Sequence, residues 1–161
     1  MIGKHLALDV GLARIGIATC DPLGITVRPL TVITRRSRRD DFGQIAQIIQ
    51  EEAVEVVVCG LPLSMDDSES EQTRTVRKWA TRLAYALRTI LGYPLPILFW
   101  DERLSTFEAQ EILSERKLKG VGEDAAAAAV ILQRYLDAKK AGSPTDYGHI
   151  TLPILQKESV N

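Results

Sequence analysis

The sequence predicts an α/β fold with a mixed five-stranded sheet, made of an antiparallel three-strand meander plus two parallel strands, with helices on both faces. Two observations carry this prediction. Three extended, β-branched runs occupy residues 6–10, 15–20 and 25–33 with no helix between them. Helical periodicity then alternates with short apolar runs at 54–59 and 95–100, which are typical of parallel strands buried on both faces.

The first hairpin places an acidic side chain in the expected core. Leu6, Leu8 and Val10 take alternate positions of the first strand with Asp9 between them, and the apolar pattern resumes at Ile15 after a glycine turn. A buried carboxylate is costly unless it is hydrogen-bonded, paired or bound to a metal. Asp9 is therefore the first candidate functional residue.

Two features mark the chain between the first hairpin and the first buried parallel strand. Pro29 lies in the third extended run and favours an edge position, because proline has no N–H for the strand ladder. Apolar residues at helical spacing predict a helix over residues 40–52, whose N-terminus Asp40 or Asp41 is expected to cap. The four arginines within residues 35–39 form either a phosphate contact or a solvated connection.

The second predicted helix begins after an acidic loop and ends before Gly92 and Pro94, two residues that stop helices. One side of it is apolar and the other is basic. Solvation alone explains most basic helix faces, but Arg74 and Arg77 are also candidates for contacts with a phosphate backbone.

Two further helices follow the last predicted strand. Ser105 and Glu108 have the spacing of a capping box, which predicts a helix over 105–118. The alanine-rich segment 125–136 predicts a helix that packs closely on the sheet, with Asp124 at its start, where capping is a sufficient structural role. We expect one domain over residues 1–140 and an extended or flexible tail over 141–161.

Composition limits the functional classes. The chain has 161 residues, of which 45% are hydrophobic and 25% charged, as in an ordinary globular domain. A formal net charge of −1 gives no strong overall attraction to nucleic acid, although a local basic patch is compatible with it. The two cysteines do not form a disulfide framework, and no signal or membrane-spanning segment is evident, so we expect a cytoplasmic protein that does not contact membranes.

Acidic residues from separate parts of the chain stand at the ends of predicted elements. Asp9, the pair Asp101 and Glu102, and Asp124 could meet at the carboxyl ends of the parallel strands. Hard oxygen ligands suit Mg²⁺ or Mn²⁺, and two such ions can activate a water and stabilise the leaving oxygen of a phosphodiester. The alternative is that these acids only cap helices and form turns.

Four motifs, in order along the chain, resemble those of the YqgF (RuvX) family. They are LDVG at 8–11 with RIG at 14–16, GLP at 60–62 with MD at 65–66, DERLST at 101–106, and Asp124 followed by AA at 127–128 and ILQ at 131–133. The resemblance implies an RNase H-like fold related to the RuvC Holliday junction resolvases. It also implies a hydrolase, a metal-dependent endonuclease that processes the 5′ end of precursor 16S ribosomal RNA in ribosome biogenesis.

On that resemblance Asp9, Asp101 and Asp124 are the catalytic, metal-binding acids. Glu102 is the alternative second ligand, because strand alternation puts it on the opposite face from Asp101, and the sequence does not show which face holds Asp9. The expected phosphate contacts are Arg14, Arg74, Arg77 and Arg103. Gly11 and Gly16 are expected to let a nucleic-acid backbone approach Asp9.

The chain departs from the family pattern near the first acid and in the loop after the GLP motif. Ala13 stands where a lysine is usual, and Asp67 stands where a glycine is common. Neither change removes a proposed ligand.

Three other functions remain open at this point. A Holliday junction resolvase would act on branched DNA as a symmetric homodimer, whereas a nuclease of single-stranded RNA can be a monomer. A non-catalytic ribosome-assembly factor would bind RNA and keep the acids for structure. An actin-like ATPase would use Asp9 for a nucleotide-bound Mg²⁺, but such enzymes need two domains around a cleft.

Overall fold

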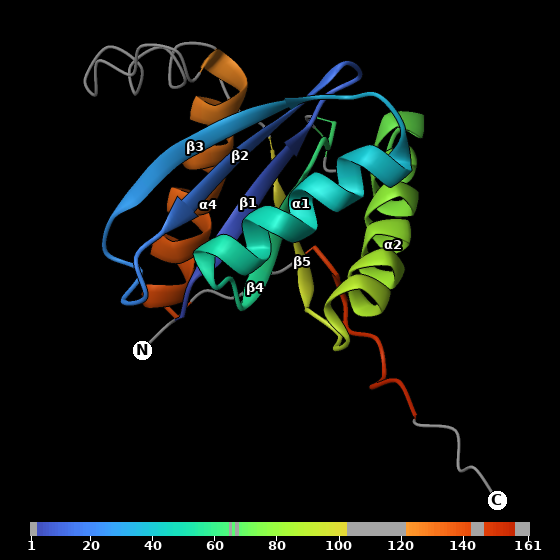
Figure 1. The fold of residues 1–161 in the computed structure, drawn as a ribbon. Coiled ribbons are helices and arrows are strands. Elements are labelled where there is room, and N and C mark those ends of the chain that lie inside the picture. The colour runs from blue at the N-terminus through green and yellow to red at the C-terminus, as the bar shows by residue number, and fades with distance from the viewer. Residues whose placement is uncertain (1–2, 65, 67, 103–121, 143–146, 157–161) are drawn as a thin grey trace, which may run out of the picture.

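The computed structural model describes residues 3–64, 66, 68–102, 122–142 and 147–156. Figure 1 shows one twisted sheet with helices α1 and α2 on one face and helix α4 on the other. The predicted helix over 105–118 and Arg103 lie outside the described residues.

The sheet has six strands in the order β3-β2-β1-β4-β5-β6. The meander consists of β1 (His5–Val10), β2 (Arg14–Cys20) and β3 (Val27–Thr34), paired antiparallel. The parallel strands β4 (Val56–Leu61) and β5 (Ile97–Asp101) extend the sheet from β1. Strand β3 lies at an edge, as Pro29 predicts.

The sixth strand corrects the prediction of five. Strand β6 (His149–Ile150) comes from the expected tail and pairs antiparallel with β5. Two residues carry no periodicity that a sequence could reveal, so the pairing depends on the exposed edge that β5 offers. Residues 149–150 thus join the sheet, although they lie beyond the predicted domain end.

Helices α1 and α2 begin at serine caps. Helix α1 (Arg38–Glu52) begins after Ser37, whose hydroxyl accepts the Asp40 N–H at 3.1 Å, so the cap is not one of the two acids that the sequence suggested. The Asp41 carboxylate instead accepts the Arg36 N–H at 3.0 Å. Helix α2 (Glu71–Leu91) begins at a capping box formed by Ser70, and helix α4 (Gly122–Lys140) contains the predicted alanine-rich segment.

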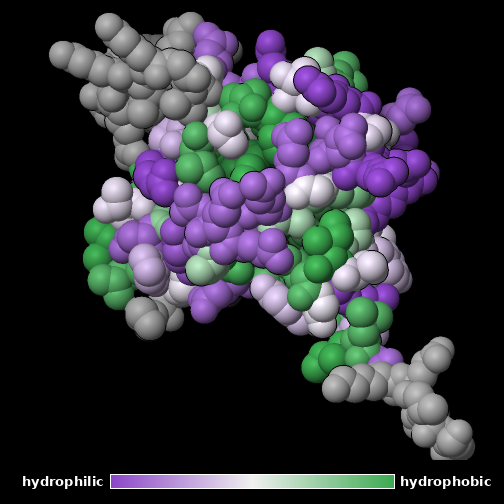
Figure 2. All heavy atoms as spheres, in the orientation of Figure 1, coloured by the Kyte–Doolittle hydropathy of each residue, from purple (hydrophilic) through white to green (hydrophobic). Residues whose placement is uncertain are grey.

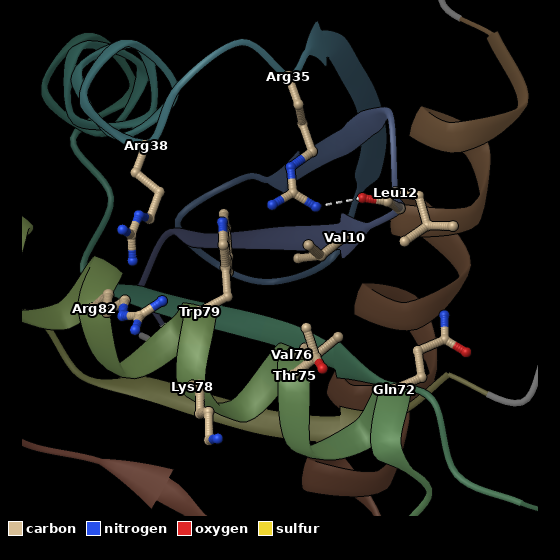
Figure 3. Close-up of a pocket in the computed structure, with 11 residues that line it drawn as sticks. Val10, Leu12, Arg35, Arg38, Gln72, Thr75, Val76, Lys78, Trp79 and Arg82 are labelled. Carbon is tan, nitrogen blue, oxygen red and sulfur yellow. Dashed lines mark hydrogen bonds between the residues drawn. The ribbon is translucent and has the colours of Figure 1, made fainter.

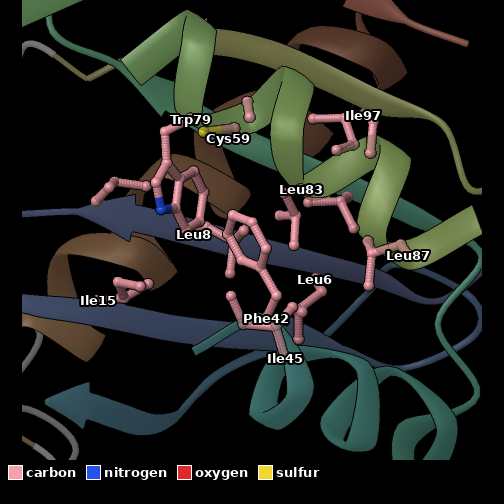
Figure 4. Close-up of a cluster of buried hydrophobic side chains, with 14 of the residues drawn as sticks. Leu6, Leu8, Ile15, Phe42, Ile45, Cys59, Trp79, Leu83, Leu87 and Ile97 are labelled. Atoms are coloured by element: carbon pink, nitrogen blue, oxygen red, sulfur yellow. The ribbon is translucent and has the colours of Figure 1, made fainter. Parts of the chain in front are cut away.

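The sheet separates two layers of core. Leu6, Leu8 and Val10 of β1 pack with α1 and α2, where Phe42 and Trp79 meet edge to face, as in Figure 4. Ala7 instead belongs to the smaller cluster under α4. Alternation along β1 therefore turns Asp9 toward the α4 side of the sheet. Within the described ranges, no helix is long and apolar enough to cross a membrane.

Candidate active site

Asp9 lies one residue before the carboxyl end of β1, opposite Gly16 of β2, on the face that α4 covers. Burial, and to a smaller degree the negative charge of Asp124, raise the pKa of Asp9 from its ordinary 3.8 to about 6. A carboxylate with a raised pKa beside a second acid is a candidate functional group, because a cation at this point would relieve both effects.

This raised pKa makes stability depend on pH. Because the native state binds the Asp9 proton more tightly than the unfolded chain, the free energy of unfolding should fall as pH rises from 3.8 to about 6 and level off above it. For a partly exposed group the loss is about 2 kcal/mol. Urea unfolding without metal, comparing the wild type with Asp9→Asn from pH 4 to 8, should show the wild type losing this amount relative to the variant. If the wild type kept or gained stability relative to Asp9→Asn as pH rises, the burial of Asp9 would be contradicted.

Asp124 reaches the site because Gly16 has no side chain. A Cβ atom at Gly16 would lie 1.9 Å from the Asp124 carbonyl oxygen and 2.2 Å from its carbonyl carbon. The first turn of α4 therefore lies directly on β2, next to the strand position that pairs with Asp9. We expected Gly16 to admit a nucleic-acid backbone, whereas in the structure it admits the helix. A glycine inside a strand is the sequence signal for such an approach.

Arg14 holds the side chain of Asp124. Its Nε, at the first residue of β2, donates to Asp124 Oδ2 in the first turn of α4 at 2.9 Å. The arginine side chain is 63% exposed and the aspartate 34%, so the pair adds little stability. Its role is positional, and it places a guanidinium beside Asp124.

The alternation of β5 separates the two candidates for the third acid. Leu61 pairs with Asp101 and belongs to the core under α1 and α2, so Asp101 lies on that face. Trp100, which packs against the α4 cluster, shares its face with Glu102. A Cβ at Gly60 would lie 3.2 Å from Glu102 Cδ and 2.6 Å from Ile131 Cδ1 of α4. Glu102 is thus on the face that holds Asp9.

The other predicted phosphate contacts lie elsewhere. Arg74 Nη1 donates to the Glu69 carbonyl oxygen at 3.3 Å. Arg77 pairs with Glu69 and lies 5.0 Å from the centre of the Phe99 ring, in the layer of α2. Of the described arginines that we predicted, Arg14 is the one that pairs with a candidate acid, Asp124.

The three acids on the α4 face do not form a closed metal cage. In the described ranges, no group of three or more aspartate, glutamate, histidine or cysteine side chains is arranged to hold an ion. Asp9, Glu102 and Asp124 nonetheless supply only carboxylate oxygens, the donors that Mg²⁺ and Mn²⁺ prefer. Such ions keep several waters and need few protein ligands, so an open set fits them.

A family model described as "RuvX: Holliday junction resolvase" matches residues 3–138. The chain belongs to the RuvX family. This confirms the family and the nuclease class that the motifs predicted.

Relatives in this family are similar over most of their length. A protein of Synechococcus elongatus named "Putative pre-16S rRNA nuclease" is 46% identical over 140 residues, covering 84% of this chain and 89% of the relative. A protein of the same name from Anaeromyxobacter sp. is 45% identical over 143 residues and is covered to 99%.

Solved structures of resolvases share the RuvX fold at low identity. Thermus thermophilus RuvC in complex with a Holliday junction substrate matches with a TM-score of 0.57 and 14% identity, over 88% of this chain and 97% of RuvC. The yeast mitochondrial Holliday junction resolvase matches with a TM-score of 0.51 and 12% identity, over 88% of this chain and 82% of that one. Together they confirm the predicted mixed sheet with helices on both faces.

Proposed function

We propose that this RuvX chain is a metal-dependent endonuclease that hydrolyses phosphodiesters of ribosomal precursor RNA at the 5′ end of 16S rRNA. The observation that carries the chemistry is the approach of Asp124 to Asp9 on the α4 face, across Gly16, where the charge of Asp124 opposes the ionisation of Asp9. The names of the relatives in Synechococcus and Anaeromyxobacter favour the RNA substrate.

The residues that would hold Mg²⁺ or Mn²⁺ are Asp9, Asp124 and Glu102. When bound, the metal supplies an activated water and stabilises charge on the phosphate oxygens. Asp101 was the favoured second ligand on the resemblance alone, but the register of β5 supports Glu102. Arg14 positions Asp124 and adds a positive charge where the phosphate backbone would pass.

A branched DNA substrate is the second candidate, because the family description and the RuvC neighbour both refer to Holliday junctions. A resolvase must cut two strands symmetrically, which favours a homodimer. The RNA nuclease has no such requirement and is compatible with a monomer. We propose the cytoplasm as the compartment, because ribosomal precursors are processed there in bacteria.

The test compares three substrates with and without metal. A precursor RNA spanning the 5′ end of 16S rRNA, a DNA of the same sequence and a four-way DNA junction are incubated with Mg²⁺, Mn²⁺ or EDTA. Metal-dependent cleavage of the RNA at a defined site supports the proposal. Cleavage of the junction alone would identify a resolvase, and RNA binding without cleavage of any substrate would identify an assembly factor.

The matched pair Glu102→Gln and Asp101→Asn tests the choice of ligand. Mutation of a residue that hydrogen-bonds a metal ligand typically lowers activity by about 10- to 100-fold, and removal of the ligand itself should lower it at least as much. We therefore expect kcat to fall by about 100-fold in Glu102→Gln. Asp101→Asn, on the other face, should stay within several-fold of the wild type. Single-turnover cleavage measures both, and a larger loss in Asp101→Asn would restore Asp101 as the ligand.

A further inference from the structure

A second concave site lies on the other side of β1 from Asp9. It is a cavity of about 350 Å³ between the turn that follows β1, the segment that leads into α1, and the first half of α2. Figure 3 shows side chains from all three elements converging on it. None of the three acids of the candidate active site lines this cavity.

Four positive side chains line the cavity. Arg35 comes from the segment between β3 and α1, Arg38 is the first residue of α1, and Lys78 and Arg82 come from α2. In Figure 3 the amine of Lys78 points away from the other three. Among the residues that the structure describes, no acidic side chain lines the cavity, and none of the four cations forms an ion pair. Figure 2 shows hydrophilic side chains crowding the surface at the upper right, over the start of α1. In a chain of net charge −1, four cations around one cavity indicate an anionic ligand.

The cavity wall beneath these cations is apolar. Val10, Val76 and Trp79 line it, and Figure 3 shows the indole of Trp79 standing up from α2 between Arg38 and Arg35. Trp79 is 5% exposed, and its Nε1 is buried with no hydrogen-bond partner in the described part of the chain. A buried N–H without an acceptor is unusual, and a ligand oxygen would satisfy it.

These two features together select the ligand class. An inorganic anion or the outer backbone of a duplex needs cations but no apolar wall. A nucleotide presents a charged phosphate and a flat base at once, and proteins that hold single strands combine basic grooves with apolar and aromatic surfaces. A base can enter a cavity only when it is unstacked, which single strands allow at low cost.

The cavity is also placed to receive the strand that Asp9 would cut. Val10 and Gly11, which line it, follow Asp9 directly in the chain, so the two sites flank one turn from opposite faces of β1. Leu12, at the tip of this turn, is 93% exposed. Arg35 fixes the turn, because its Nη1 donates to the Gly11 carbonyl oxygen at 2.7 Å.

We propose that this cationic cavity binds one unstacked nucleotide of a single-stranded nucleic acid, close to the phosphodiester held at Asp9. The inference rests on the proposed function for the nature of the substrate. It assigns to Arg38 and Arg82 the phosphate contacts, to the apolar wall the base, and to Trp79 Nε1 a hydrogen bond to a ligand oxygen.

The test is binding rather than cleavage. Fluorescence anisotropy of a labelled single-stranded RNA in EDTA is measured with Arg38→Glu, Arg82→Glu and the control Arg39→Glu, which has the same charge change on α1 but does not line the cavity. We expect Kd to rise about 10-fold or more in the first two variants and less than about 3-fold in the control, with a smaller salt dependence in the first two. Equal losses in all three, or none, would overturn the proposal.

Two further measurements separate a nucleotide from an anion. Trp79→Phe keeps a ring against Phe42 but lacks the N–H, so Kd should rise about 3- to 10-fold, and urea unfolding checks that the variant is folded under the binding conditions. A nucleoside monophosphate should displace the RNA at lower concentration than inorganic phosphate, and equal displacement by both would overturn the assignment of a base. These binding assays contain EDTA and do not depend on cleavage. A failure to cleave RNA with Mg²⁺ or Mn²⁺ would therefore contradict the proposed function and leave the binding results unchanged.

Discussion

Asp9→Asn is expected to lower kcat for RNA cleavage by about 1000-fold or more. The amide cannot supply the negative charge that a divalent ion requires, and metal catalysis contributes several kcal/mol of transition-state stabilisation, each 1.36 kcal/mol of which is about tenfold in rate. Asp9 is the acid whose surroundings oppose its charge most clearly, with a pKa raised to about 6 by burial and by Asp124. Single-turnover cleavage at saturating Mg²⁺ measures the loss.

The matched control is Asp137→Asn, the same chemical change on the exposed side of α4, where Asp137 accepts from Gln133 Nε2 at 3.0 Å. Its activity should stay within about twofold of the wild type, since exposed substitutions rarely change function or stability strongly. Undiminished cleavage by Asp9→Asn would show that Asp9 is not a ligand and would point to a contaminating nuclease.

Mg²⁺ binding at equilibrium should also distinguish the wild type from Asp9→Asn. An ion that binds the native state stabilises it in proportion to the logarithm of its concentration over Kd. Added Mg²⁺ should therefore raise the unfolding midpoint of the wild type and leave that of Asp9→Asn unchanged. A similar rise in both would place the ion elsewhere.

The first acid and the last were predictable from the sequence because each has a local signature. An aspartate inside an alternating strand is visible without any partner, and so is an aspartate at the start of an alanine-rich helix. The acid at the end of β5 was not predictable, because Asp101 and Glu102 are adjacent in the chain and point to opposite faces of the sheet. Which of them faces Asp9 depends on the pairing of Leu61 with Asp101, a register that two separate strands settle only on folding.

The features that the sequence did not reveal depend on tertiary contact. Strand β6 is two residues long, and its pairing is set by the free edge of β5. The cationic cavity joins Arg35 and Arg38 to Lys78 and Arg82, about 40 residues apart in the chain, and each pair on its own is what a solvated surface would show. The arginine cluster before α1 therefore lines a cavity only because α2 packs beside it, which the sequence does not show.

Gly16→Ala is expected to lower the free energy of unfolding by about 3 kcal/mol, at the upper end of the cost of overpacking. The added Cβ would lie 1.9 Å from the Asp124 carbonyl oxygen and 2.8 Å from the Ala125 nitrogen. Both atoms belong to the backbone, so no side-chain rotation relieves the overlap, and the first turn of α4 must move away from β2. Urea unfolding at neutral pH measures the loss.

Gly43→Ala in α1 is the control, because nothing lies within 4 Å of the position that its Cβ would take. It should raise the free energy of unfolding by about 0.5–1 kcal/mol, since alanine is the better helix former. Wild-type stability in Gly16→Ala would show that α4 does not rest on β2 as described.

Gly16→Ala should also reduce cleavage, because a displaced α4 carries Asp124 away from Asp9. Asp9→Asn and Gly16→Ala then have opposite effects on the free energy of unfolding. Asp9→Asn removes an unfavourable charge, so activity is lost while stability without metal rises, whereas Gly16→Ala disturbs the contact that brings the acids together, so both fall. If Gly16→Ala lost stability but kept full activity, Asp124 would have a structural role only, and the metal would depend on Asp9 and Glu102.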